Sequence, residues 1–229
     1  MSETLTKLQA ANPELNILDV NAPEFGRYGR VLHRHDASEV IARAKAILPH
    51  SDEIVYEASV PPLEEPAGFN TAIVQELYGG MPVQVGWCYG KNLQMAGLEY
   101  HKGTEINVCL SELVLLVGDL QDVTFGDDIT YDTTKVAAFY APEGAVVEVF
   151  PWCLHFAPIH VRKGGEFATL VYLPRGTNEP LTYQVDRVGE SKLLFAINKW
   201  LIVHPDAKAL VADAAYPGLV GDDILVKPV

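Results

Sequence analysis

Residues 97–118, GLEYHKGTEINVCLSELVLLVG, combine strand-forming residues with three side chains that bind metals. Glu99, His101 and Glu105 follow one another at spacings of two and four residues. In an extended strand, residues two apart point to the same face, so the three side chains share a face if the pleat continues through residues 102–104. One imidazole and two carboxylates on one wall are ordinary ligands of a divalent metal.

A fourth metal-binding side chain follows about fifty residues later. His155 lies in the phrase FPWCLHFAP, after a glycine turn at residues 142–144. Two strands that each carry part of one polar cluster, separated by strand-rich sequence, indicate a small β-barrel with a site in its mouth. We therefore expect one metal site made of four side chains: Glu99, His101, Glu105 and His155.

Two other interpretations of this cluster stay open at the level of sequence. Glu99 can be a hydrogen-bonding partner of a metal ligand rather than a ligand itself. His101 and Glu105 can also be a buried hydrogen-bonded pair that holds no metal, and His155 a core histidine.

The composition is that of a soluble globular protein. The 229 residues are 48% hydrophobic and 21% charged, which is enough to bury a sizeable core. The net charge of -13 argues against a nucleic acid or an anionic membrane surface as partner. No apolar run approaches the roughly eighteen residues of a spanning helix, and the N-terminus lacks the pattern of a signal peptide. We expect a cytoplasmic protein that acts on a small molecule.

Strands are predicted in the middle of the chain and helices at both ends. From residue 81 to residue 173, runs rich in strand-forming residues alternate with turns, which is typical of a sandwich or barrel. Apolar residues at helical spacing, with caps or prolines, predict helices in residues 2–12, 36–48, 69–78, 190–201 and 204–214. One compact domain in three parts is expected: an N-terminal segment that packs on the barrel (1–78), the barrel (79–176) and a C-terminal helical extension (177–229).

The two polar phrases resemble the motifs of the cupin family. Cupins carry two histidines one residue apart and a glutamate shortly after, then a glycine turn that precedes a strand with a further histidine. In EYHKGTE, His101 matches the second histidine and Glu105 the glutamate, while Glu99 stands where the first histidine usually lies. In PEGAVVEVFPWCLH, Gly144 matches the turn and His155 the late histidine. The resemblance implies a mainly β fold, a cupin (double-stranded β-helix or jelly-roll) barrel with helical N- and C-terminal additions.

Longer phrases narrow the resemblance to bacterial proteins grouped only as a domain of unknown function. These phrases are YGGMPVQVGWCYG, LEYHKGTEINV, PEGAVVEVFPWCLHFAP and LPRGTN. Cupin sugar isomerases offer an analogy, because the deoxyhexosulose-uronate enzyme has a similar Pro–Trp–x–x–His phrase. Ureidoglycolate lyases, also cupins, have a late tryptophan–histidine phrase. These similarities imply a metal-dependent enzyme.

The site chemistry favours an isomerase or epimerase acting on a small sugar or sugar acid. A divalent metal, zinc, manganese, iron or nickel, lowers the cost of an enediolate, and a nearby base moves the proton between adjacent carbons. Glu148 and Lys102 are the candidate bases. A lyase acting on a small α-hydroxy acid and a non-catalytic sugar-binding or regulatory cupin are the alternatives.

A few further residues have two interpretations each. His33 and His35 alternate and can form a metal pair, although an exposed basic segment is the simpler reading. Arg175 can bind a substrate carboxylate or lie on the surface as a loop cation. The odd count of three cysteines argues against a disulfide framework and predicts small buried hydrophobes. A homodimer is expected, because open sheet edges tend to be paired or covered.

Overall fold

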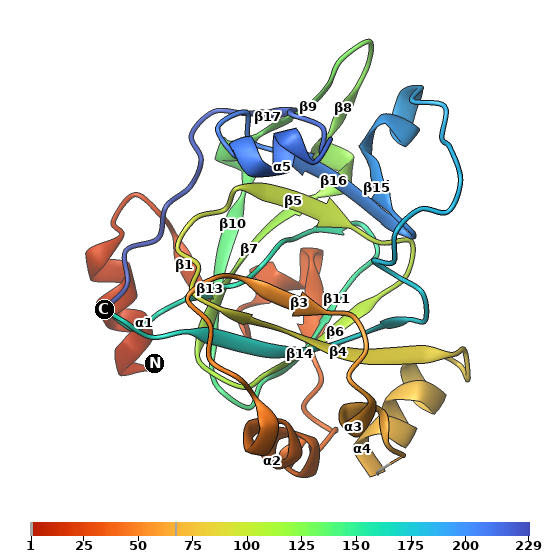
Figure 1. Ribbon diagram of the computed structural model, residues 1–229. Coiled ribbons are helices and arrows are strands. Elements are labelled where there is room, and N and C mark those ends of the chain that lie inside the picture. The colour runs from red at the N-terminus through yellow and green to blue at the C-terminus, as the bar shows by residue number, and fades with distance from the viewer. Residues whose placement is uncertain (1, 67) are drawn as a thin grey trace.

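The computed structural model describes residues 2–66 and 68–229 and shows two facing β-sheets with helices outside them (Figure 1). The first sheet runs in the order β2 (Gly29–Val31), β11 (Val146–Val149), β6 (Glu105–Cys109), β14 (Phe167–Pro174), β4 (Val83–Gly90), β3 (Val55–Glu57). The second contains β1 (Ile17–Asp19), β10 (Ala137–Ala141) and β7 (Leu113–Asp119), with β12 (Cys153–Leu154) and β13 (Ile159–His160) both paired to β7. An isolated bridge between Glu99 and His155 adds β5 (Gly97–Tyr100) beside β12.

The order of strands in space is that of a double-sheet jelly roll. In one sheet the order is β4-β14-β6-β11, and in the other β5, then β12 with β13, then β7 and β10. Consecutive strands therefore cross repeatedly from one sheet to the other, which is the arrangement that cupins use to limit free sheet edges. The mainly β, cupin-type fold predicted from the sequence is confirmed.

The strands bury three apolar layers, because both outer faces of the jelly roll are covered. Alternation along β6 shows the division: Ile106 and Val108 point outward, whereas Cys109 joins the layer between the sheets. The outer face of the first sheet lies under α2 (Ser38–Ile47), α3 (Pro61–Glu64) and α4 (Gly68–Ala72). The outer face of the second sheet packs against α1 (Glu3–Ala11) and the C-terminal tail.

The N-terminal segment supplies strands as well as helices. β1 lies parallel to β10, and β2 and β3 extend the first sheet at its two edges. The helices predicted in residues 2–12, 36–48 and 69–78 are confirmed as α1, α2, and α4 followed by a π-helical turn (Ile73–Leu77). The predicted three-part division and the predicted homodimer stay predictions.

The C-terminal tail differs from its prediction. Residues 190–201 were predicted to be helical, but they form a 3-10 turn (Gly189–Leu193) and then a hairpin of β15 (Leu194–Ala196) and β16 (Lys199–Val203). β16 pairs with β5 and so extends the second sheet. Asn198 makes the hairpin turn possible with a φ of 56°, a left-handed conformation that asparagine tolerates. The helix predicted at 204–214 is present as the shorter α5 (Lys208–Ala212).

The remaining elements lie at the periphery. A small sheet contains β17 (Leu219–Val220), β9 (Ile129–Asp132) and β8 (Thr124–Phe125). Short 3-10 turns are found at Pro23–Arg27, Leu120–Asp122 and Thr133–Lys135. Within the described part of the chain, no helix has the length and apolar character needed to cross a membrane.

Candidate metal centre

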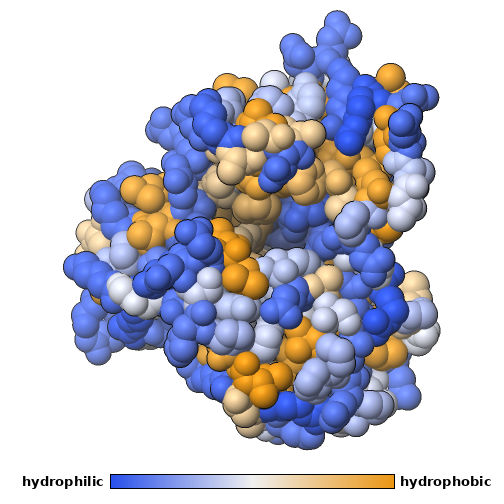
Figure 2. Space-filling model, in the orientation of Figure 1, coloured by the Kyte–Doolittle hydropathy of each residue, from blue (hydrophilic) through white to orange (hydrophobic). Residues whose placement is uncertain are grey.

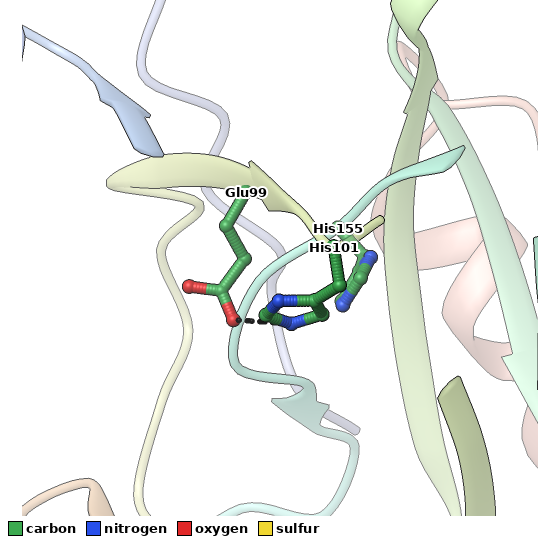
Figure 3. A group of neighbouring side chains, drawn as sticks. All are labelled: Glu99, His101 and His155. Carbon is green, nitrogen blue, oxygen red and sulfur yellow. Dashed lines mark ion pairs between the residues drawn. The ribbon is translucent and has the colours of Figure 1, made fainter. Parts of the chain in front are cut away.

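β5 presents Glu99, and the residue after the strand presents His101, to the space between the sheets. The alternate residues Leu98 and Tyr100 point outward into the apolar layer shared with α1. Glu99 Oε1 lies 3.5 Å from His101 Nε2, and Figure 3 shows the two side chains converging. The alternation predicted from the sequence therefore holds at this point.

His155 and Glu105 reach the same place from two other strands. The Glu99 N–H donates to the His155 carbonyl at 2.6 Å and the His155 N–H donates to the Glu99 carbonyl at 2.9 Å, which fixes these residues side by side. Glu105, at the start of β6, places Oε2 3.3 Å from His155 Nε2 and 3.5 Å from His101 Nε2. All four side chains are buried. The structure thus brings together the four predicted ligands, called the polar cluster below.

Both imidazoles are held through Nδ1, which leaves Nε2 turned toward the polar cluster. His101 Nδ1 lies 2.8 Å from the Asn198 carbonyl oxygen, and His155 Nδ1 lies 3.1 Å from the Cys153 carbonyl oxygen. A carbonyl can only accept a hydrogen bond, so each ring carries a proton on Nδ1 and, when neutral, keeps its lone pair on Nε2. Metal-binding histidines commonly have this arrangement.

The donor atoms of the polar cluster fit a divalent metal. His101 Nε2 is buried and, among the residues that the structure describes, has no hydrogen-bond partner. Possible ligand atoms of Glu99, His101 and His155 lie within 4.8 Å of one another. Glu105 adds a second carboxylate, with Oε2 3.3 Å from His155 Nε2 and 3.5 Å from His101 Nε2. Two nitrogens and carboxylate oxygens suit zinc, manganese, iron or nickel.

Opposite charges hold the polar cluster together. Burial alone would lower the pKa of His101, but the Glu105 and Glu99 carboxylates raise it to about 9. Burial would likewise lower the pKa of His155, but the Glu105 carboxylate outweighs this effect and raises that pKa to about 10. Burial would raise the pKa of Glu99, but Lys199 and the imidazoles lower it to about 2, and the imidazoles likewise hold the pKa of Glu105 well below its usual value. A divalent metal would therefore displace protons from the imidazoles.

A cavity of about 40 Å³ lies beside the polar cluster, between the sheets. Its wall is polar at Glu99 and Glu105 and apolar at Leu115, Val149 and Phe156. Figure 2 shows the surface hollowed between the half of the molecule with β5 and β16 and the half with β3 and β4, with apolar residues in the hollow. The cavity is bounded by residues of β3, β4 and β5, so it lies between these same halves. A larger groove of about 900 Å³ beside β1 and β10 lies away from the polar cluster.

Lys199 and Asn107 contact the polar cluster and were not identified from the sequence. The Lys199 ammonium forms an ion pair with Glu99 Oε2, and Asn107 Nδ2 donates to Glu105 Oε1 at 2.8 Å. The signal for Asn107 was available, because it lies two residues after Glu105 on the same predicted strand face. Lys199 could not be found, because its segment was predicted to be a helix.

Tyr56 is a third residue missed at the level of sequence. It comes from β3 and lines the cavity, and Asn178 Nδ2 donates to its hydroxyl at 2.8 Å. Tyr56 is 37% exposed, but its partial burial and the nearby Glu105 and Glu99 carboxylates raise its pKa, so it stays a phenol. β3 can approach β4 because of Gly86, where a Cβ would lie 1.9 Å from the Glu57 carbonyl oxygen. This close approach of β3 to β4 places Tyr56 in the cavity wall.

Glu148, predicted as a catalytic base, points away from the polar cluster. Glu148 on β11 lies opposite Ile106 on β6, so both side chains point to the outer face of the first sheet, whereas Glu105 points inward. Its carboxylate accepts hydrogen bonds from Arg30 at 2.5 Å and from Thr104 at 3.0 Å. The pleat of β11 therefore excludes Glu148 from the cavity.

Lys102, the other predicted base, also lies outside the cavity. Its ammonium is 2.8 Å from a Glu190 oxygen and 4.5 Å from the centre of the Trp200 ring. Lys102 follows His101 directly, and the turn after β5 directs it to the surface, where its side chain is 55% exposed. The structure thus brings neither predicted proton carrier to the polar cluster.

The other candidates from the sequence occupy structural positions. Arg175 lies 2.9 Å from Glu64 Oε2 and donates to a main-chain carbonyl, which matches the surface interpretation. His33 and His35 belong to no group of three potential metal ligands in residues 2–66 and 68–229. All three cysteines are buried free thiols, as predicted. Burial raises their pKa values, so they are neutral and poor nucleophiles.

Comparison with known proteins identifies the family. Residues 17–224 match the family described as Domain of unknown function (DUF4867), so the chain belongs to this family. No curated protein matches the chain. Among solved structures, an oxalate decarboxylase from Bacillus subtilis with Mn(II) centres is similar at 12% identity and a TM-score of 0.32, over 65% of this chain and 30% of that chain. Salicylate 1,2-dioxygenase from Pseudaminobacter salicylatoxidans is similar at 8% identity and a TM-score of 0.30, over 61% of this chain and 32% of that chain. The chain spans about a third or less of the length of these proteins.

Proposed function

We propose that this member of the DUF4867 family is a metal-dependent enzyme that moves a proton between adjacent carbons of a small α-hydroxy carbonyl compound, as an isomerase or epimerase does. One observation carries the proposal: two carboxylates and two imidazoles, all buried, converge beside a cavity between the sheets of a jelly roll. Such a cluster costs free energy to bury unless its charges are used or neutralised. Buried ionisable groups beside a cavity are common at catalytic sites.

The metal would be held by His101 and His155 through Nε2 and by Glu105 through a carboxylate oxygen, with Glu99 beside it. A bound divalent ion supplies Lewis acidity, which stabilises negative charge on adjacent hydroxyl and carbonyl oxygens. Asn107, by donating to Glu105 Oε1, fixes the orientation of that carboxylate. Asn198 and Cys153 do the same for the imidazoles through their carbonyl groups.

The proton acceptor is Glu99 in this proposal. The ionisable side chains that line the cavity are Tyr56, Cys88, Glu99, Glu105 and His155. Burial raises the pKa of the phenol and of the thiol, so both stay protonated and neither serves as a base. Lys199 helps to keep Glu99 ionised and contacts its second oxygen, Oε2, so Glu99 is present as a carboxylate beside the cavity. The same ion pair makes it a weak base, so proton transfer to Oε1 depends on a bound metal that stabilises the carbanion formed.

Tyr56 completes the site as a hydrogen-bond donor. Its oxygen accepts from Asn178, which leaves the phenolic proton for a ligand in the cavity. Donating to an oxygen that gains negative charge stabilises the transition state more than the ground state. Phe156, Leu115 and Val149 provide an apolar wall that limits the entry of water.

A lyase that acts on a small α-hydroxy acid is a second candidate, and the size of the cavity favours it. About 40 Å³ is less room than a pentose or hexose needs, unless β3 and β5 move apart when the sugar enters. A lyase uses the same groups, since it also begins by removing a proton beside a stabilised oxyanion.

The test combines metal analysis with proton exchange. Protein purified without chelators is measured for metal, then incubated in D₂O with aldoses, ketoses, uronic acids and α-hydroxy acids while proton NMR follows the hydrogen next to the carbonyl. We expect near-stoichiometric metal and exchange with one substrate class. His101→Ala should lose the metal. Glu99→Gln should lose exchange, while Glu112→Gln, a partly buried carboxylate that pairs with Arg162 away from the polar cluster, should keep both. A native protein without metal would rule out the proposal, and ligand binding without exchange would favour a binding protein.

A further inference from the structure

Lys199 places a positive charge beside Glu99, one of the residues that line the cavity. Its side chain is 16% exposed, and its one ion-pair partner among the described residues is Glu99. Its ammonium lies 5.7 Å from the centre of the Phe156 ring, and Phe156 lines the cavity. β16 fixes this position, because Lys199 begins the strand that pairs with β5.

The charges around the cavity leave one positive charge unpaired when a divalent metal is bound. The metal neutralises the Glu99 and Glu105 carboxylates while both imidazoles are neutral ligands, so the Lys199 ammonium has no compensating charge. The rest of the cavity wall adds none, because Asn107 and Thr169 are uncharged, and Tyr56 and Cys88 stay protonated. A buried uncompensated charge is costly, so the site favours a ligand that brings one negative charge.

The space beside the polar cluster limits the size of that ligand. A water molecule needs about 10–15 Å³ of such volume, so a cavity of about 40 Å³ holds roughly as many atoms as a few waters. The Tyr56 hydroxyl remains as a donor for the ligand, because its oxygen accepts from Asn178 Nδ2. A hydroxyl or carboxylate oxygen of the ligand can accept this hydrogen bond.

We infer that the substrate is a small monocarboxylate of three carbons that carries a hydroxyl and a carbonyl group on its other two carbons, and whose single negative charge pairs with Lys199. This inference rests on the proposed function, because it uses the same metal and the same cavity. The inference restricts the substrates to monoanions and excludes neutral sugars and polyanions. It assigns to Lys199 the role of selecting the charged substrate.

The experiment compares an anion with a neutral molecule of the same shape. Isothermal titration calorimetry on metal-loaded native protein measures the Kd values of glycolate, L-lactate and D-lactate against those of glycolamide and lactamide. We expect at least one hydroxy acid to bind 10-fold or more tightly than its amide. A dianion of similar size, tartronate, should bind more weakly than the preferred monoanion.

Variants of Lys199 test the assigned residue. Lys199→Met should abolish the preference for the acid over the amide, while Lys199→Arg should retain most of it. Lys135→Met is the matched control, since Lys135 also pairs with a carboxylate, Asp122, but on the surface; it should keep the native preference. Metal content is measured for each variant, and the comparison of acid with amide in native protein does not depend on any variant folding.

The outcomes separate this inference from the proposed function. Equal binding of acid and amide, or binding of neither, overturns the inference, whether or not proton exchange occurs in D₂O. A clear preference for the acid, with no proton exchange in D₂O, supports the inference but rules out an isomerase or a lyase. Loss of the preference in Lys135→Met, or its retention in Lys199→Met, would overturn the role of Lys199.

Discussion

Metal binding should become weaker as the pH falls, because His101 and His155 must each lose a proton. Their pKa values, raised to about 9 and about 10 by the neighbouring carboxylates, keep both imidazoles protonated in the metal-free protein between pH 6 and 8. The low pKa values of Glu99 and Glu105 mean that the carboxylates release no protons in this range. Two protons released per metal correspond to about 100-fold in Kd, or about 2.7 kcal/mol, for each pH unit.

A competition titration against a chelating dye measures this dependence. Log Kd plotted against pH should have a slope with a magnitude of about two between pH 6 and 8, and calorimetry in buffers of different ionisation enthalpy should count two protons released. His155→Ala should reduce the slope to about one. His50→Ala is the control, because the side chain of His50 is 94% exposed, and it should not change the slope. A flat profile for the native protein would refute the reasoning, since it would mean that the imidazoles are neutral before the metal binds.

Three further predictions concern stability. The pKa values of His101 and His155 are higher in the folded than in the unfolded protein, so their protonation stabilises the metal-free protein fully below about pH 6.5, the unfolded pKa. This contribution is lost as the pH rises through 9 and 10. The melting temperature of the metal-free protein should therefore fall across that window, and a constant melting temperature would contradict the ion pairs. Asn198→Ala should lower the free energy of unfolding by about 2 kcal/mol, because alanine tolerates a φ of 56° poorly and because the side-chain hydrogen bonds with Lys102 N–H and Thr177 Oγ1 are lost. Asn198→Gly should recover only the backbone part of this loss, and urea unfolding measures both. Glu148→Gln should cost about 1 kcal/mol by weakening the pair with half-exposed Arg30, yet metal analysis should show an unchanged content.

The fold and the polar cluster could be predicted because they depend on local alternation. Glu99 lies on β5 and His101 directly follows it, so alternation places these two on one face. The pleat does not continue through residues 102–104: the chain bends there, and Glu105 begins β6 in the opposite sheet and faces the other two across the space between the sheets. The proton carrier could not be predicted in the same way. Glu148 was chosen because its strand leads toward His155, but six residues lie between the two, and β11 ends at Val149. Beyond a strand end, alternation no longer relates the directions of two side chains.

Tyr56 could not be predicted for a different reason. It joins the site through pairing between β3 and β4, which lie about thirty residues apart, and through the missing side chain of Gly86. Sequence periodicity describes how one strand faces its neighbours, but it does not say which distant strand becomes the neighbour.

The C-terminal hairpin shows where periodicity misleads. Leu193, Leu194, Ile197 and Leu201 fit a helix, yet β16 is a strand whose two faces are both covered: Ile202 packs in the layer under α1, and Leu201 and Val203 pack against the segment around α5. A strand that is buried on both faces has a continuous apolar run instead of alternation, so its pattern cannot be distinguished from that of a buried helix. This hairpin contacts the candidate metal centre. Its turn places the Asn198 carbonyl at His101 Nδ1, and the first residue of β16, Lys199, contacts Glu99. The tail is therefore part of the candidate site, and its two contacts set the tautomer of His101 and help to keep Glu99 ionised.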